Sequence, residues 1–440
     1  MQSETGRSAY GSLAFTRLLR QVANGKTSIA LLDQALVSGA NFATNILLAR
    51  AFGLRDYGVY SLAWLSVLFA NSLQYALIVT PMMSVGPKQG LDERPAYFGA
   101  VLLHELIFAL VAALTELAAV MISPRFFPQW HIGRLAIPLS TATFAYLLQE
   151  FLRRYFFCMG KRHLALTSDV ISYLFQVPLI YWIIRRPPPT ISLALWCVAA
   201  TSFLGFLPLM NWFGPVLIDT SSVLRVWKRH WKMARWLAPS AFMQWGAGNL
   251  FLMSAPFYYG AAAAAILRAS QNIVAVAHVW FLGLDNVIPV EAARQMRAAG
   301  PDGMLKYIKR VSIQWGGVTL LFTMLIGLFP HFWLHLAYGS KYSLDGYVLR
   351  LYALLYLIIF MALPLRAGLL ALEYTMPIFW AYPIMIAFSI ALAGPFARRL
   401  GLTGVLLGMC FTQLISQAVV GGSLLIRIKR VRREISGQLC

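Results

Sequence analysis

The stretch AYFGAVLLHELIFALVAALTELAAVMI, residues 96–122, is an apolar run in which only Glu105 and Glu116 carry a formal charge. A helix rises about 1.5 Å per residue, so roughly 20 residues cross the hydrocarbon core of a bilayer. Lipid offers no hydrogen-bond partners to bare backbone amides, and the alternating pattern of a membrane β-barrel is absent from the sequence. The run therefore predicts a transmembrane helix.

The remainder of the chain repeats this pattern. Of its 440 residues, 59% are hydrophobic and only 12% are charged, too few charged side chains to cover a water-soluble globule of this size. The net charge of +21 does not indicate nucleic-acid binding, because the basic residues lie mostly between the apolar runs, where they orient a membrane protein. Composition thus excludes an ordinary soluble enzyme and predicts an all-α, polytopic membrane protein.

Twelve apolar runs predict twelve transmembrane helices. They fall at 28–50, 59–85, 96–122, 132–158, 164–184, 190–213, 234–258, 262–290, 306–329, 347–371, 374–396 and 401–427. The longest polar interruption lies midway along the chain and is expected to link two lobes of six helices. The predicted organisation is a basic tail at 1–27, an N-terminal lobe at 28–213, a linker at 214–233, a C-terminal lobe at 234–427 and a second basic tail at 428–440.

The distribution of positive charge predicts the orientation of the chain. If the N-terminus is cytoplasmic, the inside segments hold more Lys and Arg than the outside segments. Positive charge is retained on the cytoplasmic face, so both termini are expected there. Residues 1–26 are basic and lack an apolar core, which fits a cytoplasmic tail better than a cleaved signal peptide.

Sequence motifs for common catalytic and cofactor sites are absent. No glycine-rich phosphate loop ending in Lys-Ser or Lys-Thr occurs, so ATP is not expected to drive the protein directly. His331 and His335 lie one helical turn apart without a nearby Cys or acidic partner in the sequence. We therefore expect no metal, no cofactor and no enzymatic activity.

Polar residues at helical spacing inside predicted spans are the most informative candidates, because such groups are costly in lipid and usually face a cavity or another helix. One stripe lies in the first span, an amide and aromatic face lies in the second, and a seven-residue repeat lies in the eighth. Their candidate cavity residues are Gln34, Ser38, Asn41, Asn45, Trp64, Asn71, Gln74, Gln271, His278 and Asp285. Amides and rings of this kind suit a hydroxyl-rich sugar, although helix packing explains them equally well.

Charged residues in or near the spans have two interpretations. Asp33, Glu105 and Glu116 could bind a coupling ion or proton, or remain protonated and paired within the bundle. Arg50, Arg153, Arg154 and Arg268 could attract a diphosphate, or extend their charge to the membrane surface as many arginines do. The sequence leaves both pairs of interpretations open.

Three strings resemble a known family. LLDQALVSGANFATNILLARAFGLRDYGVYSLAW at 31–64, NSLQYALIVTPMMSVGPKQ at 71–89 and EFLRRYFFCMGKRHLALTSDV at 150–170 are similar to the polysaccharide transporter family of the multidrug/oligosaccharidyl-lipid/polysaccharide exporter (MOP) superfamily. The second half resembles that family by helix layout more than by residues.

The resemblance implies two six-helix lobes around a central cavity that opens alternately to each side. The members most similar to this chain, the Wzx-type flippases, move undecaprenyl-diphosphate-linked oligosaccharides across the bacterial inner membrane for exopolysaccharide, capsule or O-antigen synthesis. Expected partners are therefore that lipid-linked glycan, membrane lipids, and the polysaccharide polymerase and export machinery. No nucleic acid is expected.

Two other functions remain open at this point. A cation-coupled drug antiporter of the same superfamily would use Asp33, Glu105 and Glu116, and it would need carboxylates in its cavity where a diphosphate carrier needs Arg or Lys. A membrane polysaccharide polymerase or ligase would need a sizeable outer loop, whereas the longest predicted outer loop runs only from Pro330 to Gly346.

Overall fold

The structure, a computed structural model, describes residues 25–126, 132–185 and 189–437, and every regular element in these ranges is helical. The α-helices are α2 Gly25–Gln74, α3 Thr80–Val85, α4 Arg94–Ile122, α5 Ala136–Cys158, α6 Arg162–Asp169, α7 Phe175–Ile184, α8 Ile191–Phe206, α9 Thr220–Tyr259, α10 Ala261–Val274, α11 His278–Leu328, α12 Pro330–Tyr338, α13 Gly346–Ala371 and α14 Met376–Gly437. Short π or 3-10 segments are η1 Tyr75–Val79, η2 Gly86–Lys88, η3 Ser123–Arg125, η5 Ile132–Leu135, η6 Val170–Leu174, η7 Pro208–Trp212, η8 Ala275–Ala277 and η9 Ser340–Asp345.

The predicted all-α, polytopic membrane fold with twelve spans is confirmed. Eight helical stretches in the described ranges are long and apolar enough to cross a bilayer. Three of these contain a glycine with positive φ, Gly53, Gly300 and Gly401, a conformation that breaks a helix and that glycine adopts without steric cost. Each break separates two predicted spans, and the second half of α9 supplies the span predicted at 234–258.

The chain forms two compact units. Unit 1 comprises residues 1–48 and 73–235, and unit 2 comprises residues 49–72 and 236–440. The lobe boundaries predicted from sequence stay a prediction.

Helix α5 forms the centre of unit 1. In its most apolar stretch 83% of the residues are buried, whereas the corresponding figure for α4 is 17%. Helix α5 packs against α4 and α8, and small residues such as Ala142 and Ala145 lie fully buried along it. The outer face of α4 exposes Ile107, Leu110 and Leu114, as expected of a helix that faces lipid.

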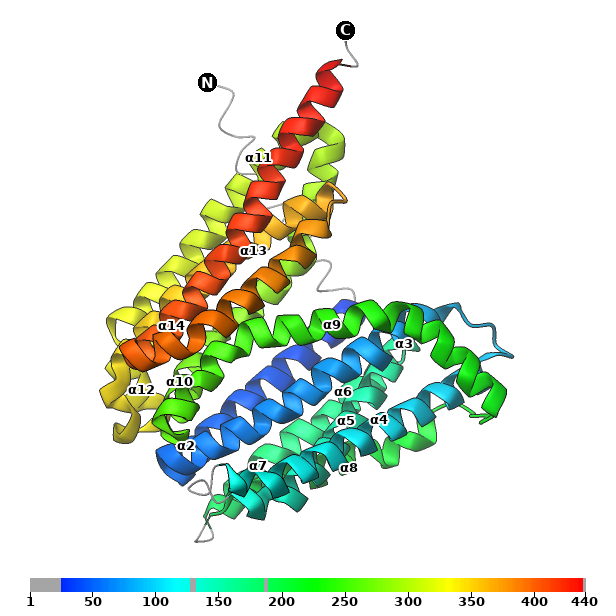
Figure 1. Cartoon of the computed structure of the whole chain (residues 1–440). Helices are drawn as coiled ribbons and strands as arrows, with labels where there is room; N and C mark the ends of the chain where they lie inside the picture. The colour runs from blue at the N-terminus through cyan, green and yellow to red at the C-terminus, as the bar shows by residue number, and fades with distance from the viewer. Residues whose placement is uncertain (1–24, 127–131, 186–188, 438–440) are drawn as a thin grey trace. The chain divides into compact units, whose positions relative to one another are not determined.

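Helices α11, α13 and α14 form the body of unit 2, where they lie side by side (Figure 1). Their shared core gathers aliphatic and sulfur-containing side chains from four helices: Ala247, Ala292, Met304, Ile308, Leu369, Ala381, Met385, Val420, Leu424 and Ile428. Helix α11 turns back on itself at Gly300, and α14 does so at Gly401. Each therefore contributes two antiparallel stretches to this core.

The start of α10 lies against Gly58 of α2. A Cβ atom at Gly58 would come within 1.8 Å of the carbonyl oxygen of Ala261. The glycine therefore allows two helix backbones to touch. This contact sets the distance between α2 and α10, and Ser61 and Ala264 follow it by about one turn of their helices.

We predict that Gly58→Ala destabilises the protein by about 1–3 kcal/mol, because the added methyl group must push α10 away from α2. The measurement is the melting temperature of the detergent-solubilised protein. Gly248→Ala is the matched control, since a Cβ there meets nothing within 4 Å. Equal melting temperatures for the two variants would contradict the close contact.

Candidate functional site

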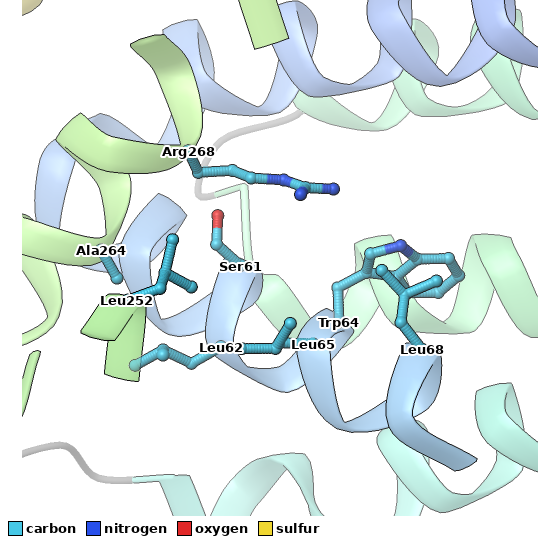
Figure 2. A pocket seen from close by; sticks show the side chains of 8 residues that line it. All are labelled: Ser61, Leu62, Trp64, Leu65, Leu68, Leu252, Ala264 and Arg268. Atoms are coloured by element: carbon cyan, nitrogen blue, oxygen red, sulfur yellow. The ribbon is translucent and has the colours of Figure 1, made fainter. Parts of the chain in front are cut away.

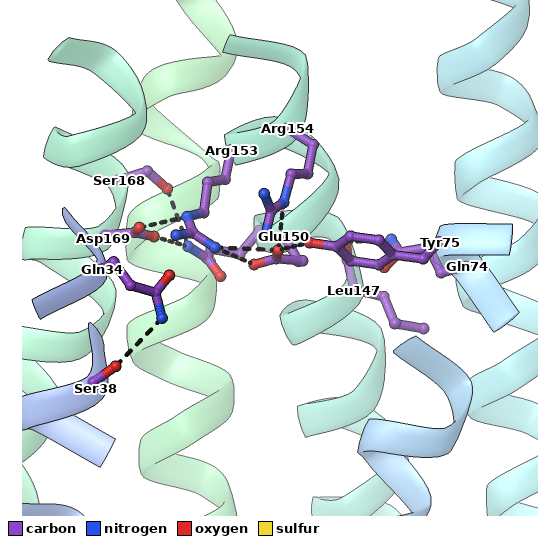
Figure 3. A network of polar contacts seen from close by, with 11 residues as sticks. Gln34, Ser38, Gln74, Tyr75, Leu147, Glu150, Arg153, Arg154, Ser168 and Asp169 are labelled. Atoms are coloured by element: carbon purple, nitrogen blue, oxygen red, sulfur yellow. Dashed lines mark hydrogen bonds and ion pairs between the residues drawn. The ribbon is translucent and has the colours of Figure 1, made fainter. Parts of the chain in front are cut away.

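A network of buried charges joins α5 to α6 in unit 1 (Figure 3). The Nε atom of Arg153 lies 2.5 Å from Oδ2 of Asp169, and its Nη1 atom lies 3.2 Å from Oε1 of Glu150. All three residues are at least 95% buried. An unpaired charge at such depth costs several kcal/mol, so each of the three depends on the others.

Two further groups complete the surroundings of Glu150. Arg154 donates from Nε to Oε1 of Glu150 at 2.9 Å, and the hydroxyl of Tyr75 donates to the same oxygen at 2.5 Å. The guanidinium of Arg154 also lies 5.0 Å from the centre of the Tyr75 ring, a distance that permits a cation–π contact. Gln149 donates to Oδ1 of Asp169 at 3.0 Å, so η1, α5 and α6 all contribute side chains to the network.

Two π-helical segments adjoin this network. Segment η1 begins at Tyr75, and segment η6 begins directly after Asp169. Such segments are rare in proteins and often occur at functional sites. The two helices that bring Tyr75 and Asp169 into the network therefore depart from regular α-helical geometry at those residues.

Glu105 on α4 has a different environment. Oε1 of Glu105 accepts a hydrogen bond from Nε2 of Gln74 at 2.6 Å, and the same Gln74 nitrogen donates to the carbonyl of Leu147 at 2.7 Å. Glu105 is fully buried, and its Oε2 atom has no hydrogen-bond partner among the described residues. An ionised carboxylate is costly in such surroundings, so the contacts suit a protonated acid. Glu116, on the same helix, is half-buried and accepts from the hydroxyl of Thr143.

The polar stripe on the first half of α2 is linked along the helix. Gln34 donates to Ser38 at 3.3 Å, and the side chain of Asn45 donates to the carbonyl of Asn41 at 2.8 Å. Gln34 is exposed, and the other three are half-buried. Asp33 precedes this stripe, and its side chain lies outside the described residues.

Unit 2 contains a pocket with one cationic wall (Figure 2). Its empty volume is about 300 Å³, and α2, α9 and α10 supply the lining: Ser61, Leu62, Trp64, Leu65, Leu68, Leu252, Ala264 and Arg268. Four leucines make most of the wall, while the Arg268 guanidinium and the Trp64 indole extend over it from opposite helices. The lining includes no carboxylate. The pocket therefore combines an aliphatic surface with one positive charge.

Aromatic and amide contacts hold the two polar walls of this pocket. Trp64 stacks on Tyr60 with ring centres 6.5 Å apart and planes 8° from parallel. Tyr57 continues the stack, and its hydroxyl accepts from Asn272 at 3.2 Å. Arg268 donates to Oε1 of Gln271 at 3.2 Å. The stack fixes Trp64, and the α10 amide orients the guanidinium.

The remaining predicted residues lie apart from both groups. Asn71 is half-buried and Asp285 is exposed, and His278 is exposed and places Nδ1 3.3 Å from the hydroxyl of Tyr356. Arg50 donates to the carbonyls of Leu336 and Ala337 at 2.6 and 2.7 Å. These bonds place a cation at the carboxyl end of α12, where positive charge stabilises a helix. The role of Arg50 observed here is thus structural.

The sequence predicts several of these residues singly, and the structure brings some of them together. The sequence predicts Trp64 and Arg268, which share a pocket, and Gln74 and Glu105, which share a hydrogen bond. It does not predict Asp169 or Gln149. The Glu150, Arg153 and Arg154 spacing was visible as ion pairs one helical turn apart, but no local pattern pointed to Asp169.

The described residues contain no group of three or more His, Cys, Asp or Glu side chains that could hold a metal ion.

Comparison with known proteins establishes the fold. Neither a protein-family profile nor a curated protein sequence matches the chain. A solved multidrug resistance MATE family transporter of the MOP superfamily, in an inward-facing conformation, is similar in structure, with a TM-score of 0.72 and 15% identity over 91% of this chain and 96% of that chain. This chain has the fold of the MOP superfamily transporters.

Two further structures share the MOP fold. A MOP superfamily transporter from Pyrococcus furiosus matches with a TM-score of 0.63 and 14% identity over 92% of this chain and 96% of that one. The reverse polarity of that transporter's binding pocket is said to suggest a different function for it. A eukaryotic MATE transporter matches with a TM-score of 0.60 and 15% identity over 93% of this chain and 99% of that one. At such identities the likeness shows the fold alone.

We predict that Asp169→Asn destabilises unit 1 by about 3–5 kcal/mol, because it leaves the buried Arg153 with half of its counter-charge. A lowered melting temperature of the purified protein is the readout. The control is Asp285→Asn, which removes the same charge from an exposed position. If both variants have the same melting temperature, Arg153 does not depend on Asp169.

Proposed function

We propose that the protein is a flippase that moves a polyprenyl-diphosphate-linked oligosaccharide from the cytoplasmic to the outer leaflet of the bacterial inner membrane by alternating access. Both termini lie in the cytoplasm in this proposal, and the chain acts as a carrier without cofactor or bond chemistry. The observation that supports it most directly is the unit 2 pocket, where a guanidinium adjoins a wall of leucines.

The chemistry of the pocket matches the chemistry of this substrate at one point. A polyprenyl diphosphate places a double anion directly beside a hydrocarbon chain. Arg binds phosphate through a planar fork of donors, and leucine side chains shield an isoprenoid chain from water. Arg268 and the leucines of α2 therefore suit the junction between the lipid and its diphosphate.

The volume of the pocket limits this assignment. The space of about 300 Å³ includes the open surroundings of the pocket, so the hollow itself is small. It can contact that junction but cannot enclose a whole oligosaccharide. The sugars would need a larger polar surface, for which the stripe from Gln34 to Asn45 of unit 1 is the candidate. Rings such as Trp64 stack on sugar faces.

A cation-coupled drug antiporter is the second candidate function. Glu105 supports it, because a buried carboxyl with one unpartnered oxygen can gain and lose a proton. Multidrug transporters are also among the solved structures with this fold. Against it stands the sign of the unit 2 pocket, whose charge would repel a cationic drug. A polymerase or ligase has no comparable support.

Transport by reconstituted protein tests the proposal. We predict that proteoliposomes move a polyprenyl diphosphate bearing a fluorescent oligosaccharide to the outer leaflet, where an impermeant glycosidase removes the sugar. Arg268→Gln should slow this movement about tenfold or more, since a hydrogen bond to a charged group contributes roughly 1.5–3 kcal/mol. Arg268→Lys should retain part of the rate, because it keeps the charge without the planar fork.

The control is Arg399→Gln, an exposed arginine of unit 2, and melting temperatures verify that each variant folds. An unchanged rate in Arg268→Gln would remove the pocket from the mechanism. Absence of glycan movement together with proton-driven export of cationic dyes would reject the flippase and favour the antiporter.

A further inference from the structure

The first sixteen residues of α9, 220–235, form a helix that lies outside the predicted spans except for its last two residues. Asp219 caps its start, since Oδ2 accepts from the backbone N–H of Ser222 at 3.0 Å and from its hydroxyl at 3.1 Å. The hydroxyl of Ser221 also donates to Oδ2, and this bond, together with those from Ser222, lowers the pKa of Asp219 to about 2. The cap is therefore ionised at neutral pH and lies where a helix favours negative charge. The segment is thus a defined helix with its own beginning.

One face of this helix is docked on unit 1. Val226, His230 and Ala234 recur every four residues and are all buried. His230 lies 2.9 Å from the hydroxyl of Tyr97 on α4, measured at Nε2. Just before the helix, the backbone N–H of Leu217 donates to the carbonyl of Pro95 at 3.0 Å. These contacts fix which of the remaining faces point away from the protein.

A second face presents large apolar side chains. Leu224, Trp227 and Trp231 follow helical offsets of 0, 3 and 7, and they are 56%, 38% and 46% exposed. The two indole rings stack with centres 5.7 Å apart. Exposed tryptophans on a helix outside the spans are costly in water but typical of the interface between lipid and water.

A third face is strongly basic. Residues 220–235 include no acidic side chain, and all of its cationic residues are exposed. They are Arg225, Lys228, Arg229, Lys232 and Arg235. On a helical wheel they occupy one arc that borders the Leu224 and Trp231 face. A helix with apolar, basic and docked faces side by side has the pattern of an amphipathic helix that lies in a membrane surface.

We infer that residues 220–235 form an interfacial anchor that lies in the cytoplasmic surface of the bilayer and binds the head groups of anionic phospholipids. The tryptophans enter the boundary between head groups and acyl chains, and the cations above them meet the phosphates. Lys and Arg close to an anionic bilayer surface are attracted to its phosphates. An acidic protein segment would match the basic face alone, whereas a lipid surface matches the basic and the indole faces together.

The inference is independent of what the protein transports, and hydrogen exchange of the full-length protein in nanodiscs tests it. One disc contains only phosphatidylcholine, and the other contains one third phosphatidylglycerol. We expect backbone amides in 220–235 to exchange at least about threefold more slowly in the anionic disc, because bound head groups hold the helix against local opening.

Two variants separate charge from insertion. Replacing Arg225, Lys228, Arg229 and Lys232 by Gln should abolish the dependence on phosphatidylglycerol. Trp227→Gln with Trp231→Gln should raise exchange in both discs. The matched control replaces four exposed cations of α11, Arg297, Lys306, Lys309 and Arg310, and it should leave exchange in 220–235 unchanged.

Equal exchange in the two discs would overturn the inference, as would a lipid dependence that survives the fourfold replacement. Protection that appears only when an acidic protein is added would also overturn it and assign the surface to a protein partner. Unchanged melting temperatures in the variants ensure that the docked face, with His230 and Tyr97, is intact.

Discussion

A charge buried among apolar helices must find its partners inside the protein, and in unit 1 Arg153 meets this constraint. Its guanidinium contacts Glu150 on its own helix and Asp169 on the next, and all three side chains are almost completely buried. Removing one partner leaves an uncompensated charge. The arrangement of α5 and α6 therefore depends on this interaction, and two π-helical segments, η1 and η6, lie beside it.

The two units use arginine in different ways. Arg153 is buried between two carboxylates, whereas Arg268 is half-buried at the wall of a leucine-lined pocket and donates to the neutral amide of Gln271. A guanidinium therefore joins two helices through buried ion pairs in unit 1 and lines a pocket in unit 2. Because both residues are arginines, the difference between these roles comes from burial and from the charge of the neighbouring side chains.

Much of the fold was predictable, and less of the site. The apolar runs gave twelve spans because hydrocarbon thickness sets helix length, and Gly53, Gly300 and Gly401 interrupt helices between predicted spans. The bond between Gln74 and Glu105 joins residues that were each singled out as polar groups in lipid. The partnership of Arg153 with Asp169 was not predictable, because it depends on how α5 packs against α6 rather than on spacing within either helix.

The sequence by itself determined that the chain is helical and membrane-spanning, since these properties follow from composition and from periodicity along single helices. Only the tertiary structure decided which polar residues meet. It paired Arg50 with the end of α12, placed Trp64 and Arg268 over one pocket, and sorted residues 220–235 into docked, apolar and basic faces. The physical reason is that a side chain's chemistry depends on its neighbours in space, and those come from helices far apart in the chain.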